Sequence, residues 1–496
     1  MENMKNNVEV APRPKKRVRI APVASNQPPA VAPGFELKPK DATSVSFAAP
    51  SSQPTKNSTT AMHFPPPAPT STSAPATSVA SAVLGTTNVI APQQAIKQLH
   101  EEGQEFMCHA NKAIRFWFPS SPNELNEILS NNAAASTIHP AYTHQLFGDD
   151  ETIIGFKELT IDMIYSASTF RLLYQEKFSD RLVTIGQIPS ENDIVDKLRE
   201  ALPGGWTRDV DAFRSELATE STSFIPPGEV VHQYDGYEVR RSVPSEDSRA
   251  KEIHERVETM AMYTIDGATY ADLDDHRWSV YTVYRLTDRA LVGYMTVFTF
   301  DNPFRTNISL PRKAMRVCQL LIMPQHQRQG HGRRLLEVAH AEVRRLDMYE
   351  LTVEDPNNAF TRMRDSMDMR CCLEKNYFHL NDASWSLSLD NNMDTIRTDM
   401  RVTTGQINKC YEVLKLHALD QSISSVAATT TTTTTTTTSS SMSNFRLNVK
   451  RRLWNAHKAE LKKIEDKAVR MQAIELLWRE VASNYRVSYA NAFGAK

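Results

Sequence analysis

The chain has 496 residues, of which 40% are hydrophobic and 23% are charged, and its formal net charge at pH 7 is -1. This length exceeds what one compact core organises, so several domains, or domains joined to disordered segments, are expected. The balanced charge excludes a uniformly basic or acidic protein, so any argument for binding nucleic acid or a basic protein must rest on local patches.

The cysteines and the hydropathy pattern predict an intracellular, soluble protein. The five cysteines are few for such a long chain, which favours free thiols in a reducing compartment: Cys108, Cys318, Cys371, Cys372 and Cys410. The sequence has no CxxC pair, so no metal site is expected. No apolar run approaches the roughly 20 residues that cross a bilayer, and the polar residues 1–8 do not start a secretory signal, so no membrane partner is expected.

Residues 1–95 are predicted to form a disordered tail. Fifteen of the 27 prolines fall before residue 93, among Ala, Ser, Thr and Val, and such a segment buries too little apolar surface to offset its ordering entropy. Residues 12–19 read Pro-Arg-Pro-Lys-Lys-Arg-Val-Arg, the form of a nuclear import signal. A random basic patch is the alternative interpretation.

Residues 96–230 are predicted to form a first α/β domain. Apolar alternation predicts strands over 151–165 and 181–188, and a Ser N-cap predicts a helix over 190–202.

Residues 231–388 carry stronger signals and are predicted to form a second α/β domain. Strands are expected over 278–286, 291–300 and 315–323, and a short strand over 351–353 that ends at Glu354. Between the last two strands, residues 335–346 predict an amphipathic helix. Its expected apolar face consists of Leu335, Leu336, Ala339, Val343 and Leu346.

The remainder is predicted to be a helical segment over 389–420, a Ser/Thr-rich linker over 421–443 and a second helical segment over 444–496. The linker contains an uninterrupted threonine run from residue 429 to residue 438. The last segment has twelve Lys and Arg against five Asp and Glu. A solvated helical face is at least as good an explanation of this charge as a nucleic-acid surface, so direct binding to DNA is left open.

One loop indicates a specific chemistry. Residues 317–323 form a predicted buried strand, a polar loop with two glycines follows, and an amphipathic helix begins near Gly332. Backbone N–H groups at a helix N-terminus form an anion site, and glycines let the backbone approach a pyrophosphate closely. A tight strand-to-helix turn without a ligand is the alternative.

The loop sequence Gln-Arg-Gln-Gly-His-Gly at 327–332 fits the (Gln/Arg)-x-x-Gly-x-(Gly/Ala) signature of the GNAT superfamily of N-acetyltransferases. A dinucleotide fold is excluded because GxGxxG is absent. The flanking residues 319–322, 353–356 and 363–365 resemble those of the type B histone acetyltransferase catalytic subunit. Four further segments, 142–152, 272–278, 292–297 and 446–453, resemble the same family.

The resemblance implies a GNAT N-acetyltransferase fold with an α/β N-terminal domain, a helical C-terminal segment and a disordered N-terminal tail. It implies acetyl-coenzyme A as co-substrate and direct transfer to a lysine amine in a ternary complex. The residues expected to bind the cofactor are Leu320, Leu321, Ile322, Gln327, Arg328, Gln329, Gly330, His331, Gly332 and Arg333.

Three acids are candidates for proton transfer. The resemblance assigns the general base to Glu354 and a second acid to Asp266, where the family has the longer Glu. Asp355 is included as a catalytic candidate, although an N-cap followed by Pro356 at the first helical position is the favoured interpretation. Cys318 raises the rival mechanism of an acyl-enzyme, but a small core thiol is the preferred explanation.

The resemblance also implies the substrate and the partners. The expected histone-binding residues are Asp149, Asp150, Glu151, Trp278, Phe298, Thr299 and Phe300. The resemblance further implies acetylation of the N-terminal tail of newly made histone H4, with histone H3 as a complex member, a WD40-type histone chaperone as partner, and a location in nucleus and cytoplasm. The alternatives are an N-acetyltransferase acting on a small amine or another protein, and a histone-binding scaffold without activity.

Overall fold

The computed structural model describes residues 103–130, 137–181, 204–302, 311–380, 392–428 and 432–494, and no side chain within 425–439. The predicted tail 1–95 with its basic cluster, the helix over 190–202 and nearly all of the strand over 181–188 lie outside the described residues. All described residues belong to one compact unit of the chain.

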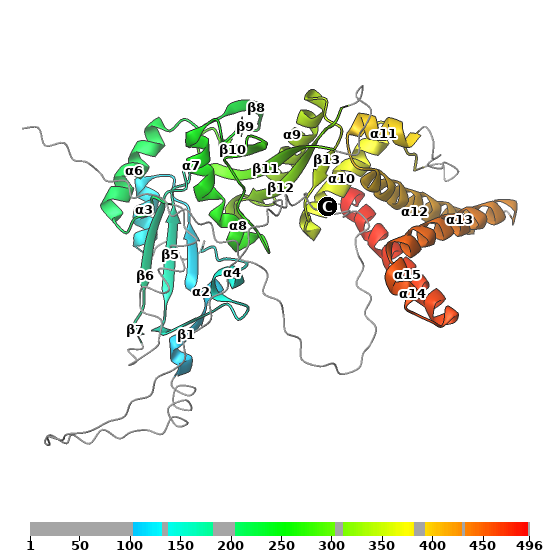
Figure 1. Cartoon of the computed structure of the whole chain (residues 1–496), viewed down its shortest axis with the longest axis horizontal. Helices are drawn as coiled ribbons and strands as arrows, with labels where there is room; N and C mark the ends of the chain where they lie inside the picture. Colours follow the sequence, from blue (N-terminus) through cyan, green and yellow to red (C-terminus); the bar gives the residue numbers. More distant parts are fainter. Residues whose placement is uncertain are drawn as a thin grey trace, which may run out of the picture. The chain divides into compact units, whose positions relative to one another are not determined.

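The largest sheet has six strands in the spatial order β13-β12-β11-β10-β9-β8 (Figure 1). Their bounds are β8 (Glu229–Tyr234), β9 (Tyr237–Ser242), β10 (Trp278–Arg285), β11 (Leu291–Asp301), β12 (Lys313–Ile322) and β13 (Leu351–Val353). Neighbouring strands run antiparallel except β12 and β13, which are parallel. A parallel pair needs a crossover connection, and α9 (His331–Arg345) forms it here.

Helices cover both faces of this sheet. On one face, α9 buries Leu335, Leu336, Ala339 and Val343 against strand residues such as Val317. On the other face lie α7 (Ser248–Val257) and α8 (Thr259–Thr264). Their residues Ile253, Val257, Met260 and Tyr263 share a core with Tyr284, Tyr294 and Leu321 of the sheet. Apolar residues therefore alternate between two cores along the strands.

The N-terminal domain extends the second of these cores. Its three-stranded sheet has the order β2-β5-β6, and β1–β3 and β4–β7 form two-stranded pairs. The elements are η1 (Gly103–Phe106), β1 (Met107–His109), α2 (Ala110–Ala113), β2 (Ile114–Trp117), α3 (Pro122–Leu129), α4 (His144–Phe147), β3 (Thr152–Ile154), β4 (Phe156–Lys157), β5 (Thr160–Tyr165), β6 (Leu172–Lys177), β7 (Asp180–Arg181) and α6 (Val210–Ser223). Because β2 and β5 residues pack with α7 and α8 in a single core, this domain is fused to the central sheet.

The C-terminal part is a helical module with its own core. Its helices are α10 (Asn358–Glu374), α11 (Asn392–Met400), α12 (Thr404–Ala428), α13 (Thr432–Ala456), α14 (Lys458–Lys462) and α15 (Lys467–Phe493). Three ion pairs join its helices: Arg452 donates twice to Glu412 at 2.8–2.9 Å, and Arg446 and Lys450 each pair with Glu475. Part of the positive charge of segment 444–496 is thus neutralised within the module.

The structure confirms every strand and helix predicted between residues 278 and 353, and it corrects several other predictions. The expected strand over 151–165 is divided into β3, β4 and β5, with positive φ at Gly155 and Glu158. Leu346 is 38% exposed and lies outside the apolar face of α9, which ends at Arg345. The first strand of the central sheet starts at Glu229, two residues before the predicted domain boundary.

The predicted linker over 421–443 is also wrong for the residues described. Residues up to Ala428 continue α12, and α13 starts at Thr432 within the threonine run. Threonine has only modest helix propensity. The helix therefore depends on its other half, where Phe445, Val449 and Leu453 enter the core of the module.

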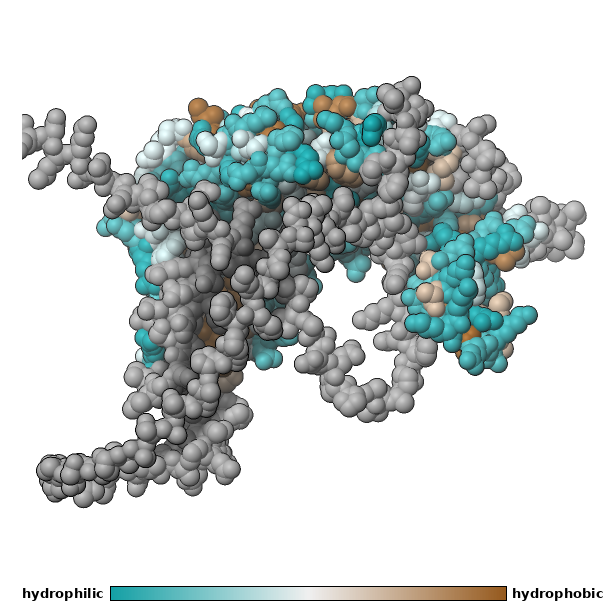
Figure 2. Space-filling view, viewed as in Figure 1, coloured by the Kyte–Doolittle hydropathy of each residue, from teal (hydrophilic) through white to brown (hydrophobic). Residues whose placement is uncertain are grey.

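The surface carries no large apolar face in the view of Figure 2. Hydrophilic residues dominate the described part of that face, and apolar residues form small, separate patches. None of the helices in the described part of the chain is long and apolar enough to cross a membrane.

The buried His254 predicts an acid-sensitive fold. Burial lowers the pKa of its imidazole to about 3, and the ring packs edge-on against Tyr294 at 5.0 Å between centroids. An unfolded histidine has a pKa near 6.5, so below that pH the unfolded chain binds a proton that the folded chain does not. Stability is therefore fully present above pH 6.5 and falls, for this residue alone, by about 1.4 kcal/mol per pH unit below it.

The test compares wild type with His254→Phe in urea unfolding at pH 7, 6 and 5. The variant should show the shallower loss of unfolding free energy. Because every other titrating group is common to both proteins, the difference between the slopes reports His254. Identical slopes would contradict the assignment of a neutral, buried imidazole.

Candidate active site

The central feature of the site is the divergence of two parallel strands. β12 pairs with β13 only from Met315 to Val317, opposite residues 351–353. The last contact is the Glu354 N–H, which donates to the Val317 carbonyl oxygen at 2.9 Å. From residue 319 to residue 322, β12 pairs with β11 alone. A row of β12 backbone groups therefore faces the gap left by β13, where it is available to a ligand.

A bulge marks the point of divergence. The β11–β12 register shifts between Thr296 and Val297, which are opposite Gln319 and Val317, so Cys318 is the extra residue. The Gln319 N–H donates to the Thr296 hydroxyl oxygen at 3.0 Å. A bulge bends its strand and redirects its side chains, as expected beside a site.

Glu354 lies at this bulge. It follows the last residue of β13, the position that the sequence predicts, and it is exposed. Burial, together with the adjacent Glu354 carboxylate, raises the pKa of the Cys318 thiol far above its usual range. Only the thiolate is a good nucleophile, so the structure argues against a cysteine acyl-enzyme.

The N-cap interpretation of Asp355 is wrong. The cap of α10 is Asn357, whose side-chain oxygen accepts the Phe360 N–H at 2.9 Å. Asp355 is exposed and has a φ of +32° in the turn between β13 and the helix. Asn has a side-chain oxygen that caps a helix as well as that of Asp. The helix therefore does begin with a polar N-cap, but two residues after the predicted position.

The predicted phosphate loop has the geometry of an anion site. Gly330, with φ +94°, is the N-cap of α9 and provides no side-chain cap. The first N–H groups of α9 therefore keep their hydrogen-bonding capacity at the positive end of the helix dipole. Arg328 is also in the left-handed region, at φ +62°, and the Gln327 side chain donates to the Ile322 carbonyl oxygen at 3.0 Å.

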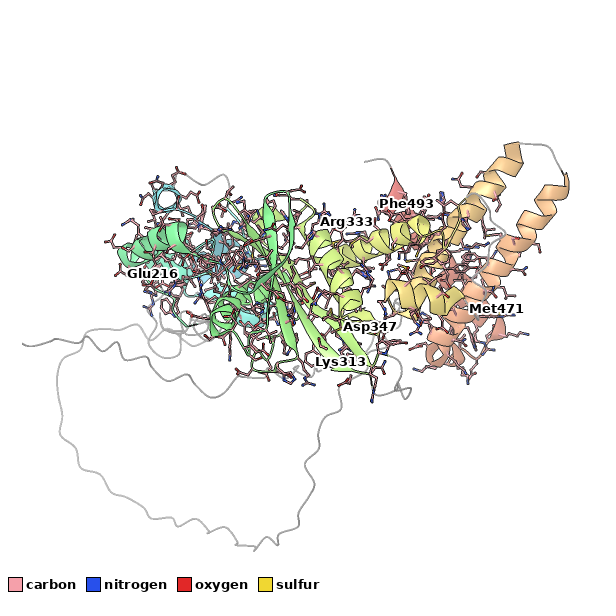
Figure 3. All side chains as sticks on the ribbon, turned by 90° about the horizontal axis from the view of Figure 1, so that it is seen from above. Glu216, Lys313, Arg333, Asp347, Met471 and Phe493 are labelled. Atoms are coloured by element: carbon pink, nitrogen blue, oxygen red, sulfur yellow. The ribbon has the colours of Figure 1, made fainter. Side chains whose placement is uncertain are left out.

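The rest of the loop brings the cofactor-site candidates together. A Cβ at Gly332 would lie 3.5 to 3.7 Å from atoms of Met363, Leu320 and Ile322, so the helix start touches the diverging strand. Arg333 pairs with Glu337 at 2.9 Å, on the first turn of α9 (labelled in Figure 3, with Asp347 beyond the other end of the helix). Gln329 donates to the Gln325 carbonyl oxygen. The strand, the loop and the helix thus suit a pyrophosphate joined to an extended arm.

His331 has a role that its sequence position does not reveal. Its side chain is buried, and its Nδ1 is 2.8 Å from the Tyr234 hydroxyl. The edge of its ring lies against Tyr237, with 4.6 Å between centroids, and burial lowers its pKa. The neutral imidazole therefore fastens the first residue of α9 to the β8–β9 hairpin. Tyr234 lies 97 residues away in sequence, so no local pattern predicted this contact.

The second candidate acid lies on a different element. Asp266 begins the 266–275 loop after α8, and its side chain is 70% exposed and 3.3 Å from the Nε2 of His144. The N-terminal domain holds this loop through Gln145, which donates to the Ala268 carbonyl oxygen at 3.1 Å. The loop reaches the diverging strand through Gln319, whose amide donates to the Thr269 carbonyl oxygen at 2.8 Å.

The candidates for substrate binding divide into two groups. Trp278 and Phe298 are cross-strand partners with ring centroids 5.0 Å apart, and Arg277 lies over the Phe298 ring at 4.8 Å. Thr299 follows on β11, and Phe300 is covered by Arg316 at 5.0 Å. By strand alternation Trp278, Phe298 and Phe300 lie on one face of β10 and β11, where they form an aromatic strip, whereas Thr299 points to the opposite face.

The acidic candidates for substrate binding differ in whether their carboxylates are exposed or already paired within the protein. Glu151 accepts N–H groups of Thr143 (2.6 Å) and His144 (3.1 Å), which lowers its pKa, so its carboxylate braces α4. Asp149 and Asp150 are exposed. Asp272, Asp274 and Asp275 form a second acidic cluster. Asp272 is exposed, whereas Asp274 pairs with Lys251 and Asp275 with Arg277. No group of three potential metal ligands occurs among the residues described.

The two glycines of the loop predict different mutational effects. Gly330→Ala forces a side chain into the left-handed region, at a cost of roughly 1–2 kcal/mol, and should weaken acetyl-coenzyme A binding about tenfold. Gly332→Ala, the matched control, places its Cβ at ordinary contact distance and should leave the Kd within about threefold. Isothermal titration calorimetry measures both. Equal Kd values for the two variants would contradict this description of the loop.

Comparisons with known proteins agree with this geometry. Residues 106–266 match the family model described as the N-terminus of histone acetyl transferase HAT1, and residues 247–363 match the acetyltransferase (GNAT) family. The histone acetyltransferase type B catalytic subunit of Mus musculus is 28% identical over 71% of this chain and 82% of its own length. The Homo sapiens protein of the same name is 27% identical over 71% of this chain and 81% of its length.

A solved aminoglycoside acetyltransferase from a soil metagenome is 15% identical, covers 31% of this chain and 97% of its own, and has a TM-score of 0.22. The family models and the two relatives carry the assignment. The diverging strands, the uncapped helix start and the signature loop coincide with the region matched by the acetyltransferase family. Residues 247–363 therefore form an acetyltransferase domain of the GNAT type, and the chain is an acetyltransferase related over most of its length to the type B histone acetyltransferase catalytic subunits.

Proposed function

We propose that the protein transfers acetyl from acetyl-coenzyme A to a lysine on the N-terminal tail of newly synthesised histone H4, directly and within a ternary complex. The observation that carries the proposal is the position of Glu354, which follows β13 at the point where β12 and β13 separate. The names of the related proteins support histone as the substrate class.

In the proposed mechanism Glu354 takes a proton from the lysine ammonium, because only the neutral amine attacks. The amine nitrogen forms a bond to the thioester carbonyl carbon and the carbon–sulfur bond then breaks. The thiolate leaves and takes up the second proton, which the nitrogen loses as it becomes an amide. A backbone N–H of residues 320–322 stabilises the oxyanion. The exposure of Glu354 lets the carboxylate pass its proton to water before the next turnover.

The surface around the site supports a basic peptide as the acceptor. Exposed Asp149, Asp150 and Asp272 complement the positive charge of a histone tail. The aromatic strip around Trp278 and Phe298 suits the aliphatic stem of a lysine side chain. Asp266 is the proposed second acid, and its carboxylate is 3.3 Å from the Nε2 of His144.

The partners and the location belong to the same proposal. We propose that the enzyme acts with a WD40-type histone chaperone, receives histone H4 together with histone H3, and is present in both nucleus and cytoplasm. These assignments are what the resemblance described from the sequence implies. Pull-down of purified H3–H4 with the enzyme, with and without the chaperone, tests the complex.

Removal of the proposed base should abolish transfer and spare binding. Glu354→Gln keeps the shape of the side chain but cannot accept the proton, so kcat should fall by about 10²–10⁴-fold with an unchanged Kd for acetyl-coenzyme A. Asp355→Asn is the matched control, because it neutralises the adjacent exposed acid, and it should retain most of the activity. Activity that survives in Glu354→Gln would show that another group is the base.

The acceptor is tested by mass spectrometry of a histone H4 tail peptide after incubation with acetyl-coenzyme A. A mass increase on lysine side chains is the expected result. Turnover on polyamines with none on the peptide would refute the histone substrate and favour a small amine. Binding of acetyl-coenzyme A without transfer to either acceptor would favour a non-catalytic scaffold.

A further inference from the structure

A hydrogen-bonded network lies behind the divergence of β12 and β13, on the sheet face opposite α9. Its centre is the side chain of Gln319, the residue after the bulge. The amide nitrogen donates to the Glu258 carboxylate at 3.2 Å and to the Thr269 carbonyl oxygen at 2.8 Å. The amide oxygen accepts from the Tyr294 hydroxyl at 2.8 Å. Both amide hydrogens and the amide oxygen of Gln319 are therefore engaged.

The backbone of Gln319 is held as firmly as its side chain. Its N–H donates to the hydroxyl of Thr296, which is fully buried. Strand β12 is thus fixed from two directions at one residue, immediately before Leu320. Residues 320–322 are the ones assigned to the acetyl group and the adjoining arm, so the position of Gln319 sets where their N–H groups point.

Glu258 extends the network to the 266–275 loop. Its side chain is 2% exposed and lies at the junction of α7 and α8. One carboxylate oxygen accepts both the Gln319 amide and the Ala271 N–H, the latter at 2.6 Å. Two backbone groups of the loop are therefore hydrogen-bonded to this pair of side chains: the Thr269 carbonyl oxygen to Gln319 and the Ala271 N–H to Glu258. This loop begins with Asp266 and carries the second acidic cluster.

A buried carboxylate is costly, and apolar packing of similar volume would stabilise the fold equally well. The buried Glu258–Gln319 pair is therefore better explained by the positions that it fixes for β12 and the 266–275 loop than by a contribution to the stability of the fold. We propose that Glu258 and Gln319 are positioning residues. They join β12, the strand that binds the acetyl group, to the 266–275 loop on the amine-binding side, and they thereby align the thioester with the attacking amine. The proposal rests on the acetyltransferase activity and does not depend on histone H4 as the acceptor.

Gln319→Leu tests the coupling. It removes the bonds to Glu258, Thr269 and Tyr294 but keeps the side-chain volume and the backbone bond to Thr296. Misplacement of reactants by about 1 Å costs up to about 10²-fold in rate, so kcat should fall about tenfold or more. The phosphate loop is untouched, so the Kd for acetyl-coenzyme A should stay within about threefold.

The matched control is Gln406→Leu in the C-terminal module. Gln406 is buried and also bridges two acids, because it donates to Asp365 at 3.0 Å and to Asp368 at 2.9 Å. These bonds join α12 to α10 within the C-terminal module. Its substitution should lower the melting temperature by a similar amount and leave kcat unchanged. A loss of kcat in Gln319→Leu no larger than in the control would overturn the proposal.

Two variants of Glu258 separate hydrogen bonding from charge. Glu258→Gln retains an oxygen that accepts from Gln319 and Ala271, so it should keep kcat near the wild-type value. Glu258→Leu loses that oxygen and should match Gln319→Leu, and the double Leu variant should be little worse than either single one. Fully additive losses in the double variant would show that the two residues act independently and would refute the coupling.

All rates are measured with whichever amine the wild-type enzyme acetylates, whether histone peptide or polyamine. Absence of turnover on histone H4 then refutes the proposed substrate alone. Wild-type kcat in Gln319→Leu refutes the positioning role alone.

Discussion

The site depends on a hydrogen-bond ladder that stops early. β12 and β13 are paired over only three residues on each strand, and the Glu354 N–H bonded to the Val317 carbonyl oxygen is the last link. A longer ladder would close the gap with β13 backbone and leave no place for a thioester. A shorter one would release Glu354 from the strand end. The bulge at Cys318 follows directly from this constraint, because β12 must bend where its partner leaves.

Long-range contacts hold the elements around this gap in place. The Tyr234–His331 contact anchors the start of α9, and the Glu258–Gln319 pair anchors β12 and the 266–275 loop. The N-terminal domain shares a core with α7 and α8 and holds the same loop through Gln145. The loop that begins with Asp266, the proposed second acid, is thus held by both domains. The helical module joins through α10, which packs on α9, α12 and α15.

The sequence predicted the parts of the site that lie within one continuous segment. The strand, the glycine loop and the helix over 315–346 follow from periodicity and from two glycines, and Glu354 follows from its place after a short strand. Contacts between distant residues, such as Tyr234 with His331 and Glu258 with Gln319, leave no local signature and were missed. The Asp355 cap and the threonine linker failed because Asn357 offers an equal capping oxygen and because packing of Phe445 and Val449 overrides weak propensity.

Acetyl-coenzyme A is proposed to occupy the gap between β12 and β13 and the uncapped start of α9. Hydrogen–deuterium exchange with and without acetyl-coenzyme A tests this position, since it reports backbone N–H groups one segment at a time. Slower exchange on binding is expected in residues 318–322 and 328–334, with no change in α13 or α15. Protection confined to other segments, with these two ranges unaffected, would contradict this position.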